Sequence, residues 1–336
     1  MGNLENLTLR SATRRIEGVS FPAIIHNGSY FLSDINVFED GVVDCWGGVD
    51  LPLFKKKVSQ GWVKTSMPDG MVLSAHHLAH MTIQNADWMM TPKTLVKRVK
   101  SIVKALNPTL TNLYDMRGDE IDRSGKVGMA KVNRTGNATW RVDGESAIFR
   151  NPIQGVTSKA FWRLDNSVNI VTVSLFNDDR IRITGAGKAE EMTLDALRQD
   201  DRLCTATKGD HVEIEGLGAF TLSDIEFTVP RDDFLAELEM NRDRTSGRQT
   251  SVSQTVAAFK DYKKNPTKES LEVLRAAYSS VPAHLRRYCG DMDSKDIPIR
   301  IALYGEDEIE NWSHYAVAKS RGETLPFIRV PKVKDE

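Results

Sequence analysis

Cysteine and net charge are both scarce in this chain. Its 336 residues include three cysteines, Cys45, Cys204 and Cys289, which lie far apart and form no CxxC pair. This spacing argues against a structural zinc module and is typical of a reducing, intracellular setting, so the sequence predicts a cytoplasmic protein. The formal net charge is −1, which gives no global field toward nucleic acid or a membrane. An electrostatic partner must therefore contact a local patch.

Long apolar runs are absent as well. No stretch of about 18 apolar residues exists, so no membrane-spanning helix and no membrane partner are expected. The first 15 residues are polar and contain no apolar segment typical of a secretory signal. Hydrophobic residues make up 40% and charged residues 27% of the chain, which is typical of a soluble globular protein. Its length allows two or three domains with ordinary cores.

What the sequence does contain is an internal duplication. Ile-Glu-Gly-Val-Ser starting at Ile16 returns as Ile-Gln-Gly-Val-Thr starting at Ile153. One inserted residue near Asp165 then aligns the segment up to position 46 with the segment up to position 184. The apolar positions coincide at one offset: Tyr30, Leu32, Ile35, Val37, Val43 and Cys45 match Val168, Ile170, Val173, Leu175, Ile181 and Ile183.

Within each copy, apolar residues alternate with polar ones, which predicts half-buried strands. The alternation changes phase between Leu32 and Ile35, which suggests a β-bulge. Glu39-Asp40-Gly41 has the composition of a hairpin turn. A short helix is expected near 51–58. We therefore predict an α+β protein with two tandem, divergent, small β-rich modules, each a barrel or a curled sheet, and a mainly helical C-terminal domain.

The expected domains follow from these patterns. They are a flexible arm at 1–15, a first β-rich module at 16–90, a basic helix and connector at 91–150, a second β-rich module at 151–230, and the helical domain at 231–336. A hairpin is expected at 128–142. In the last domain we predict helices at 232–243, 250–263, 268–280 and 306–321, an exposed loop at 241–253, a strand at 297–304, and an extended apolar tail at 325–333 that packs down.

The clearest helix in the sequence runs from Pro92 to Leu106, with Thr91 as its N-cap and a proline at the first helical position. One face is apolar. The opposite face carries the cations Lys93, Lys97, Arg98, Lys100 and Lys104, and Lys55, Lys56 and Lys57 extend the patch if the fold brings them near. Such a surface suits contact with nucleic acid or another partner. It also suits the ordinary solvated face of an amphipathic helix.

Three histidines, His76, His77 and His80, fall within five positions. In a helix, His76 and His80 would have the i, i+4 spacing of metal ligands. The repeat predicts a strand instead, where these two side chains share a face about 13 Å apart, too far for one ion. Surface or interface histidines, a phosphate contact and a metal site remain the alternatives.

Acidic residues gather near the C-terminus, where Asp291, Asp293 and Asp296 precede a cluster at 306–310. Converging carboxylates hold Mg²⁺ in many enzymes. The same residues are also typical of a turn followed by the acidic first turn of a helix. They are the candidate catalytic residues.

The sequence thus favours a non-catalytic binding or adaptor protein that acts as a subunit of a larger assembly. Expected partners are other protein subunits or a second copy of the chain, and DNA or RNA through the basic helix. No cofactor is predicted. The alternative is a metal-dependent nuclease or other hydrolase, with Mg²⁺ at the aspartates or Zn²⁺ at the histidines.

Overall fold

The structure is a computed structural model that describes residues 15–114, 133–135, 140–141, 153–176 and 178–333. The chain divides into two compact units, residues 1–229 and residues 230–336. The predicted arm lies almost wholly outside the described residues. Among the described residues, no helix is long and apolar enough to cross a membrane.

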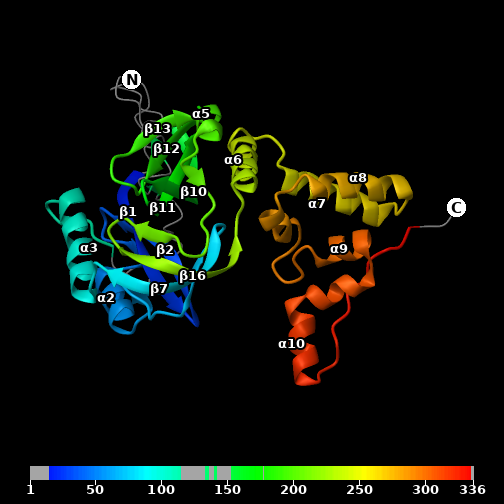
Figure 1. Cartoon of the computed structure of the whole chain (residues 1–336), viewed down its shortest axis with the longest axis horizontal. Coiled ribbons are helices and arrows are strands. Elements are labelled where there is room, and N and C mark those ends of the chain that lie inside the picture. The colour runs from blue at the N-terminus through cyan, green and yellow to red at the C-terminus, as the bar shows by residue number, and fades with distance from the viewer. Residues whose placement is uncertain (1–14, 115–132, 136–139, 142–152, 177, 334–336) are drawn as a thin grey trace, which may run out of the picture. The chain divides into compact units, whose positions relative to one another are not determined.

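The first copy is a curled sheet with two helices beside it (Figure 1). Its elements are β1 (Arg15–Asn27), β2 (Ser29–Phe38), β3 (Val43–Asp44), β4 (Gly48–Val49), α2 (Leu51–Ser59), β5 (Val63–Lys64), β6 (Val72–Ala75), β7 (Ala79–Trp88) and α3 (Pro92–Leu106). The Asp40–Gly41 turn joins β2 to β3 as predicted, with a φ of 81° at Gly41. Both helices are also where the sequence places them.

The second copy repeats this order. Its elements are β10 (Ile153–Leu164), β11 (Ser167–Phe176), β12 (Arg180–Thr184), β13 (Glu190–Thr193), α5 (Leu194–Gln199), β14 (Leu203–Cys204), β15 (His211–Ile214) and β16 (Gly218–Thr228). The strand registers repeat too. Antiparallel Gly18–Phe38 corresponds to Gly155–Phe176, and parallel Tyr30–Leu73 corresponds to Val168–Val212. The duplication is therefore present in the structure as well as in the sequence.

The two copies are joined edge to edge. Strand β16 pairs with β7 in an antiparallel manner, so the sheet runs β13-β12-β11-β15-β16-β7-β6-β2-β1-β5 through both copies. One buried core is built from both sets of strands, with Ile24, Leu73, Met81 and their counterparts Phe161, Val212 and Phe220 among its members. Neither copy completes this core alone.

The change of phase in β2 is real, but the predicted bulge is wrong. The β1–β2 register runs unbroken from the Asn27–Ser29 pair to the Gly18–Phe38 pair. Tyr30 and Leu32 lie in the core shared by the copies, whereas Ile35 and Val37 lie in a second core. Successive strand residues point to opposite faces, so the shift marks the place where the strand changes which face is buried.

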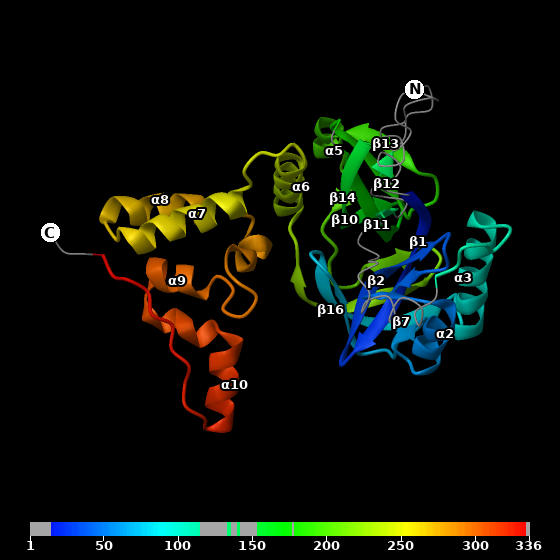
Figure 2. The ribbon, with the colours of Figure 1, turned by 180° about the vertical axis from the view of Figure 1, so that it is seen from behind.

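The second core lies beneath α2 and α3, which Figures 1 and 2 show next to each other on the first copy. Phe54 and Val58 of α2 and Leu95, Val99 and Val103 of α3 are buried there. Thr91 caps α3 in a capping box with Thr94. Each fully buried aliphatic side chain stabilises this packing by about 1.5–3 kcal/mol. In the second copy, the short α5 stands at the place of α2, and α6 (Arg231–Thr245) follows β16 as α3 follows β7.

Two short strands belong to the predicted connector, β8 (Asn133–Thr135) and β9 (Trp140–Arg141). Most of the predicted hairpin at 128–142 lies outside the described residues. Its two described pieces pair with β1 and β10, respectively. In the described residues these strands thus extend the two copies instead of forming a hairpin of their own.

The C-terminal unit is helical. It contains α6 (Arg231–Thr245), α7 (Ser251–Lys264), α8 (Lys268–Ser279), α9 (Ile297–Tyr304), α10 (Ser313–Arg321) and 3₁₀ helices at Ala283–Cys289 and Glu306–Asn311. The tail packs down as predicted, since Val330 and Val333 contact the core and the Tyr262 hydroxyl donates to the Pro331 carbonyl at 2.7 Å.

Three predictions for this unit were wrong. The expected strand at 297–304 is helix α9, because an apolar run buried on most sides has no diagnostic period, and Pro298 and Gly305 mark helix ends. The expected loop at 241–253 is mostly helix, and the break comes at Gly247, where φ is 72°. The expected helix at 306–321 is interrupted at Trp312, whose ψ is 125°.

Candidate functional site

The cations predicted from the sequence lie on two neighbouring helices of the first copy. Helix α2 carries Lys55, Lys56 and Lys57, α3 carries four lysines and an arginine, and neither helix contains an acidic residue. We call the six exposed lysines of these helices the basic layer: Lys55, Lys56, Lys93, Lys97, Lys100 and Lys104. The four lysines of α3 recur at intervals of four, three and four, so they share one face over about 16 Å.

Arg98 does not belong to this face, although the sequence grouped it with the lysines. Its guanidinium lies over the Phe21 ring, 4.4 Å from the centroid, and it lines a cleft at the seam of the two copies. Partial burial lowers the pKa of Arg98, against the opposite effect of Glu215. The stripe on α3 therefore contains lysines only.

An aromatic group stands beside α2. The Trp46 ring lies 4.9 Å from Phe31 and 6.3 Å from Trp62, between ring centroids, and the Lys57 ammonium lies 4.6 Å from the Trp62 centroid. We call Phe31, Trp46 and Trp62 the aromatic platform. Trp46 is 48% exposed and has a φ of 66°, a left-handed conformation that is rare for a bulky residue.

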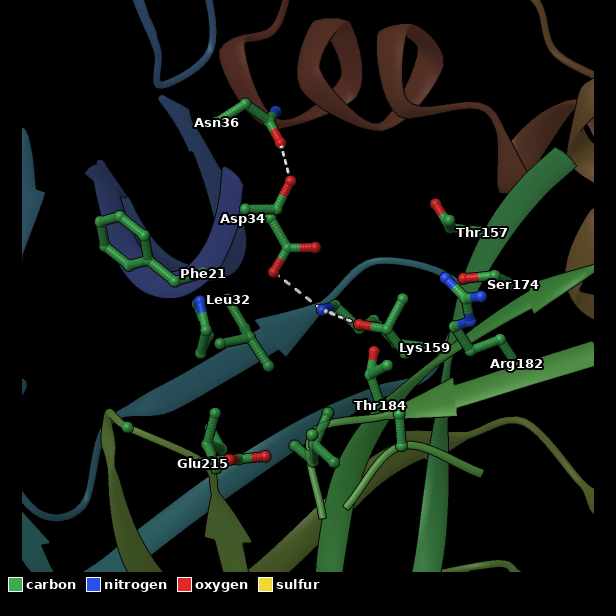
Figure 3. A pocket seen from close by; sticks show the side chains of 18 of the residues that line it. Phe21, Leu32, Asp34, Asn36, Thr157, Lys159, Ser174, Arg182, Thr184 and Glu215 are labelled. Atoms are coloured by element: carbon green, nitrogen blue, oxygen red, sulfur yellow. Dashed lines mark hydrogen bonds and ion pairs between the residues drawn. The ribbon is translucent and has the colours of Figure 1, made fainter. Parts of the chain in front are cut away.

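The inter-copy cleft has a volume of about 990 Å³ and is lined by both copies. Its polar walls include corresponding residues of the duplication: Ser20 and Asn36 on one side, and Thr157 and Ser174 on the other. Leu32, Ile170 and Ile214 connect it to the shared core. Figure 3 shows Leu32 and Asn36 of the first copy and Thr157 and Ser174 of the second among the side chains that line the cleft.

One ion pair crosses the cleft. The Lys159 ammonium donates to Asp34 at 2.8 Å and to the Thr172 hydroxyl at 2.7 Å (Figure 3). By the repeat, Lys159 corresponds to Pro22 and Asp34 to Thr172, so divergence of the two copies created this contact. A second pair, Arg182–Glu191 at 2.7 Å, lines the same cleft. These charges neutralise each other, which suits a seam between the copies better than a site for an ion.

The three histidines are not arranged on one strand as predicted. His76 and His77 occupy the turn between β6 and β7, with their ring centroids 3.9 Å apart and a φ of 56° at His77. His80 lies on β7 with its ring 5.9 Å from Phe227. The predicted strand ends at Ala75 because the chain must turn back into β7.

The three aspartates each have a local structural contact. Asp291 accepts hydrogen bonds from the amides of Asp293 and Ser294, and the Ser294 amide is the main reason for its lowered pKa. The Asp293 carbonyl accepts from the Trp312 indole at 2.9 Å. Asp296 is buried and accepts from the Tyr278 hydroxyl. Among the described residues, no group of three or more His, Cys, Asp or Glu side chains has the arrangement to hold a metal ion.

The cysteines have the properties of core residues. Burial raises the pKa of both the Cys45 and Cys289 thiols to about 11, so the reactive thiolate is scarce at neutral pH. We expect these two thiols to react with Ellman's reagent at pH 8 only after unfolding. Comparing thiol titration of the native protein with titration in guanidinium chloride checks this, and rapid modification of Cys45 in the folded protein would refute it.

Comparison with known proteins agrees with the duplicated architecture. A family model described as "Domain of unknown function (DUF7638)" matches residues 8–110 and again residues 145–249. The chain therefore belongs to this family, with two tandem segments of it. A second family model, "Domain of unknown function (DUF7639)", matches residues 250–327. The searches of curated proteins and of solved structures gave no match.

The sequence did not single out Trp46, although its neighbour Cys45 matches Ile183 of the second copy. A signal was nevertheless present: Trp46 corresponds to Thr184, and Phe31 corresponds to Asn169. The strand pairs Ile24–Lys64 and Phe161–Cys204 also place Arg202 where the first copy has Trp62. The aromatic platform is thus absent from the second copy, which folds without it.

Proposed function

We propose that this protein is a non-catalytic, nucleic-acid-binding subunit of a larger cytoplasmic assembly, and that the basic layer is its contact with the phosphate backbone. The charge of α2 and α3 supports this function. Two adjacent helices without an acidic residue stand in a chain whose net charge is −1. A solvated helix face usually carries charges of both signs, whereas a surface that follows a polyanion carries one.

The geometry of α3 also supports the proposal. Its lysines extend about 16 Å along one helix face, while successive phosphates of one strand of duplex DNA are spaced about 3.4 Å along the axis. Several phosphates can therefore be contacted at once. The buried face of α3 is fixed against the sheet by Leu95, Val99 and Val103, so the lysines are presented by a rigid element and not by a loop.

Replacing Lys97 and Lys100 with glutamine tests the function. We expect binding of a labelled DNA or RNA oligonucleotide to weaken about tenfold or more, because two phosphate contacts are lost. The slope of log K against log salt should also fall by about 2. Fluorescence anisotropy across a salt series measures both quantities.

The matched control is Lys263→Gln with Lys264→Gln, which removes two exposed lysines from the last turn of α7. This variant changes the net charge equally but should leave binding within about twofold. If both double variants weaken binding to the same extent, the effect comes from net charge and the basic layer is not the contact. If the native protein does not bind nucleic acid, the proposed function is wrong.

Contacts with other subunits are assigned to the C-terminal unit in this proposal. Its surface exposes large apolar side chains, with Met292 87% and Phe327 77% accessible. Phenylalanine and methionine are enriched in protein interfaces relative to the rest of the surface. The binding of a partner or of a second copy by this unit agrees with an adaptor role.

A further inference from the structure

We propose that Trp46 is a stacking surface for an unpaired base, so that the protein selects single-stranded over double-stranded nucleic acid. This inference rests on the proposed function, because it names the form of nucleic acid that the basic layer holds. The aromatic side chain concerned is exposed, has a left-handed backbone and has no aromatic counterpart in the second copy.

The exposure and the backbone of Trp46 are both unusual. Nearly half of the side chain is accessible, at 48%, while φ is 66°. Left-handed backbone is unfavourable for a non-glycine residue, and only about half of this side chain is buried in return. The second copy has Thr184 at the corresponding position, and it keeps the pairs Ser174–Arg182 and Leu175–Ile181 that correspond to Asn36–Asp44 and Val37–Val43.

The ring is nevertheless held in a defined position. Its indole nitrogen donates to the Ser33 hydroxyl at 3.1 Å, and Phe31 and Trp62 contact it. Trp62 is anchored in turn by a hydrogen bond to the Cys45 carbonyl at 3.4 Å and by the Lys57 ammonium 4.6 Å from its ring centroid. An exposed ring that is fixed in advance loses little conformational entropy when a flat ligand stacks on it.

The charge nearby identifies the flat ligand. Lys57 belongs to α2, which also carries the exposed Lys55 and Lys56. Proteins that hold single strands combine aromatic side chains with a cationic groove for the backbone, and stacking tolerates any base because every base has a π-face. In a duplex the faces of the bases are already stacked on one another, so Trp46 offers an advantage only to an unpaired base.

The test compares Trp46→Ala with the native protein on an oligothymidylate of about 12 nucleotides and on a duplex of similar length. Stacking on one aromatic residue contributes a factor of about five to a hundred in affinity, so single-strand binding should weaken by that factor. Duplex binding should change by less than about twofold, and the salt slope should stay the same because no charge is lost. Trp46→Phe should retain most of the affinity.

Two further variants control for folding and for the general removal of an aromatic ring. Trp46→Asn removes the ring but tolerates the left-handed backbone, so it should remain folded and lose the same single-strand affinity. Tyr304→Ala removes an aromatic ring of similar exposure, 54%, from the end of α9 in the C-terminal unit and should leave binding unchanged. Thermal unfolding confirms that each variant is folded.

The outcomes separate this inference from the function on which it rests. If Lys97→Gln with Lys100→Gln weakens binding but the Trp46 variants bind both nucleic acids like the native protein, the basic layer stands and the stacking role is refuted. Equal losses of single-strand and duplex binding in Trp46→Asn would also refute it. If the native protein binds neither oligonucleotide, the proposed function is wrong, and this inference, which rests on it, is wrong as well.

Discussion

Gly218→Ala should lower the free energy of unfolding by more than about 4 kcal/mol, in the range that single substitutions seldom reach. Gly218 opens β16 and pairs with Trp88 of β7, at the junction of the two copies. A Cβ atom at this position would stand 2.4 Å from the Asp87 carbonyl oxygen and 3.0 Å from the Trp88 Cα. Because both atoms belong to the backbone, the strands must separate to accept it.

The corresponding residue of the first copy lies at the other end of the same strand pair. By the repeat, Gly218 corresponds to Ala79, which pairs with Thr228. Ala79, which has a Cβ atom, stands opposite the smaller residue Thr228. Gly218, which has no Cβ atom, stands opposite Trp88. The junction between the copies is asymmetric at its two ends.

Gly209→Ala is the matched control for this prediction. Gly209 also has a positive φ, 92°, but no atom lies within 4 Å of its Cβ position. Its replacement should cost only the backbone strain, about 1–2 kcal/mol. Urea unfolding of both variants measures the difference, and similar losses in the two proteins would show that close packing at the junction does not matter.

Phe220→Ala should destabilise the protein by about 3–5 kcal/mol, because it leaves a cavity in a closely packed core. Phe220 is fully buried in the core built by both copies, with its ring 6.1 Å from that of Trp88. Since the first copy depends on the same core, the loss should not be confined to the second copy. Phe220→Leu keeps much of the volume and should cost less.

Hydrogen exchange followed by mass spectrometry resolves the two copies in this experiment. In Phe220→Ala, amides of β1–β2 and of β10–β11 should exchange faster by the same factor, as expected when both open in one cooperative step. Faster exchange in β10–β11 alone would mean that the copies fold independently, and the shared core would then not be the basis of their stability.

Local patterns were sufficient for many elements. The capping residues and the apolar stripe of α3 predicted that helix closely, since caps, proline positions and a 3.6-residue period are properties of neighbouring residues. The Asp-Gly turn after β2 and the duplication itself could also be predicted from the sequence, because both depend only on the order of residues along the chain. The run at 297–304 was not, because an apolar segment that is buried on most sides suits a strand and a helix equally.

The candidate site was predictable in part. The lysines were found because they recur at helical spacing, but the departure of Arg98 toward Phe21 depends on what packs beside α3. The aspartates at 291–296 looked like a cluster in the sequence, yet the carboxylates of Asp291 and Asp296 have different hydrogen-bond partners in the fold, Ser294 and Tyr278. Trp46 could have been singled out by its mismatch with Thr184, but its exposure and its neighbours are visible only in three dimensions.

By itself, the sequence determined that this protein contains two related β-rich units, a helix with a lysine face, and a helical C-terminal region, because periodicity and repetition are written along the chain. Only the tertiary structure decided that the two copies complete one core, and that the change of phase between Leu32 and Ile35 marks a strand passing from that core to another. It also brought together Asp34 and Lys159, which are 125 residues apart. Contacts of this kind depend on how strands pair and curl, which local patterns do not specify.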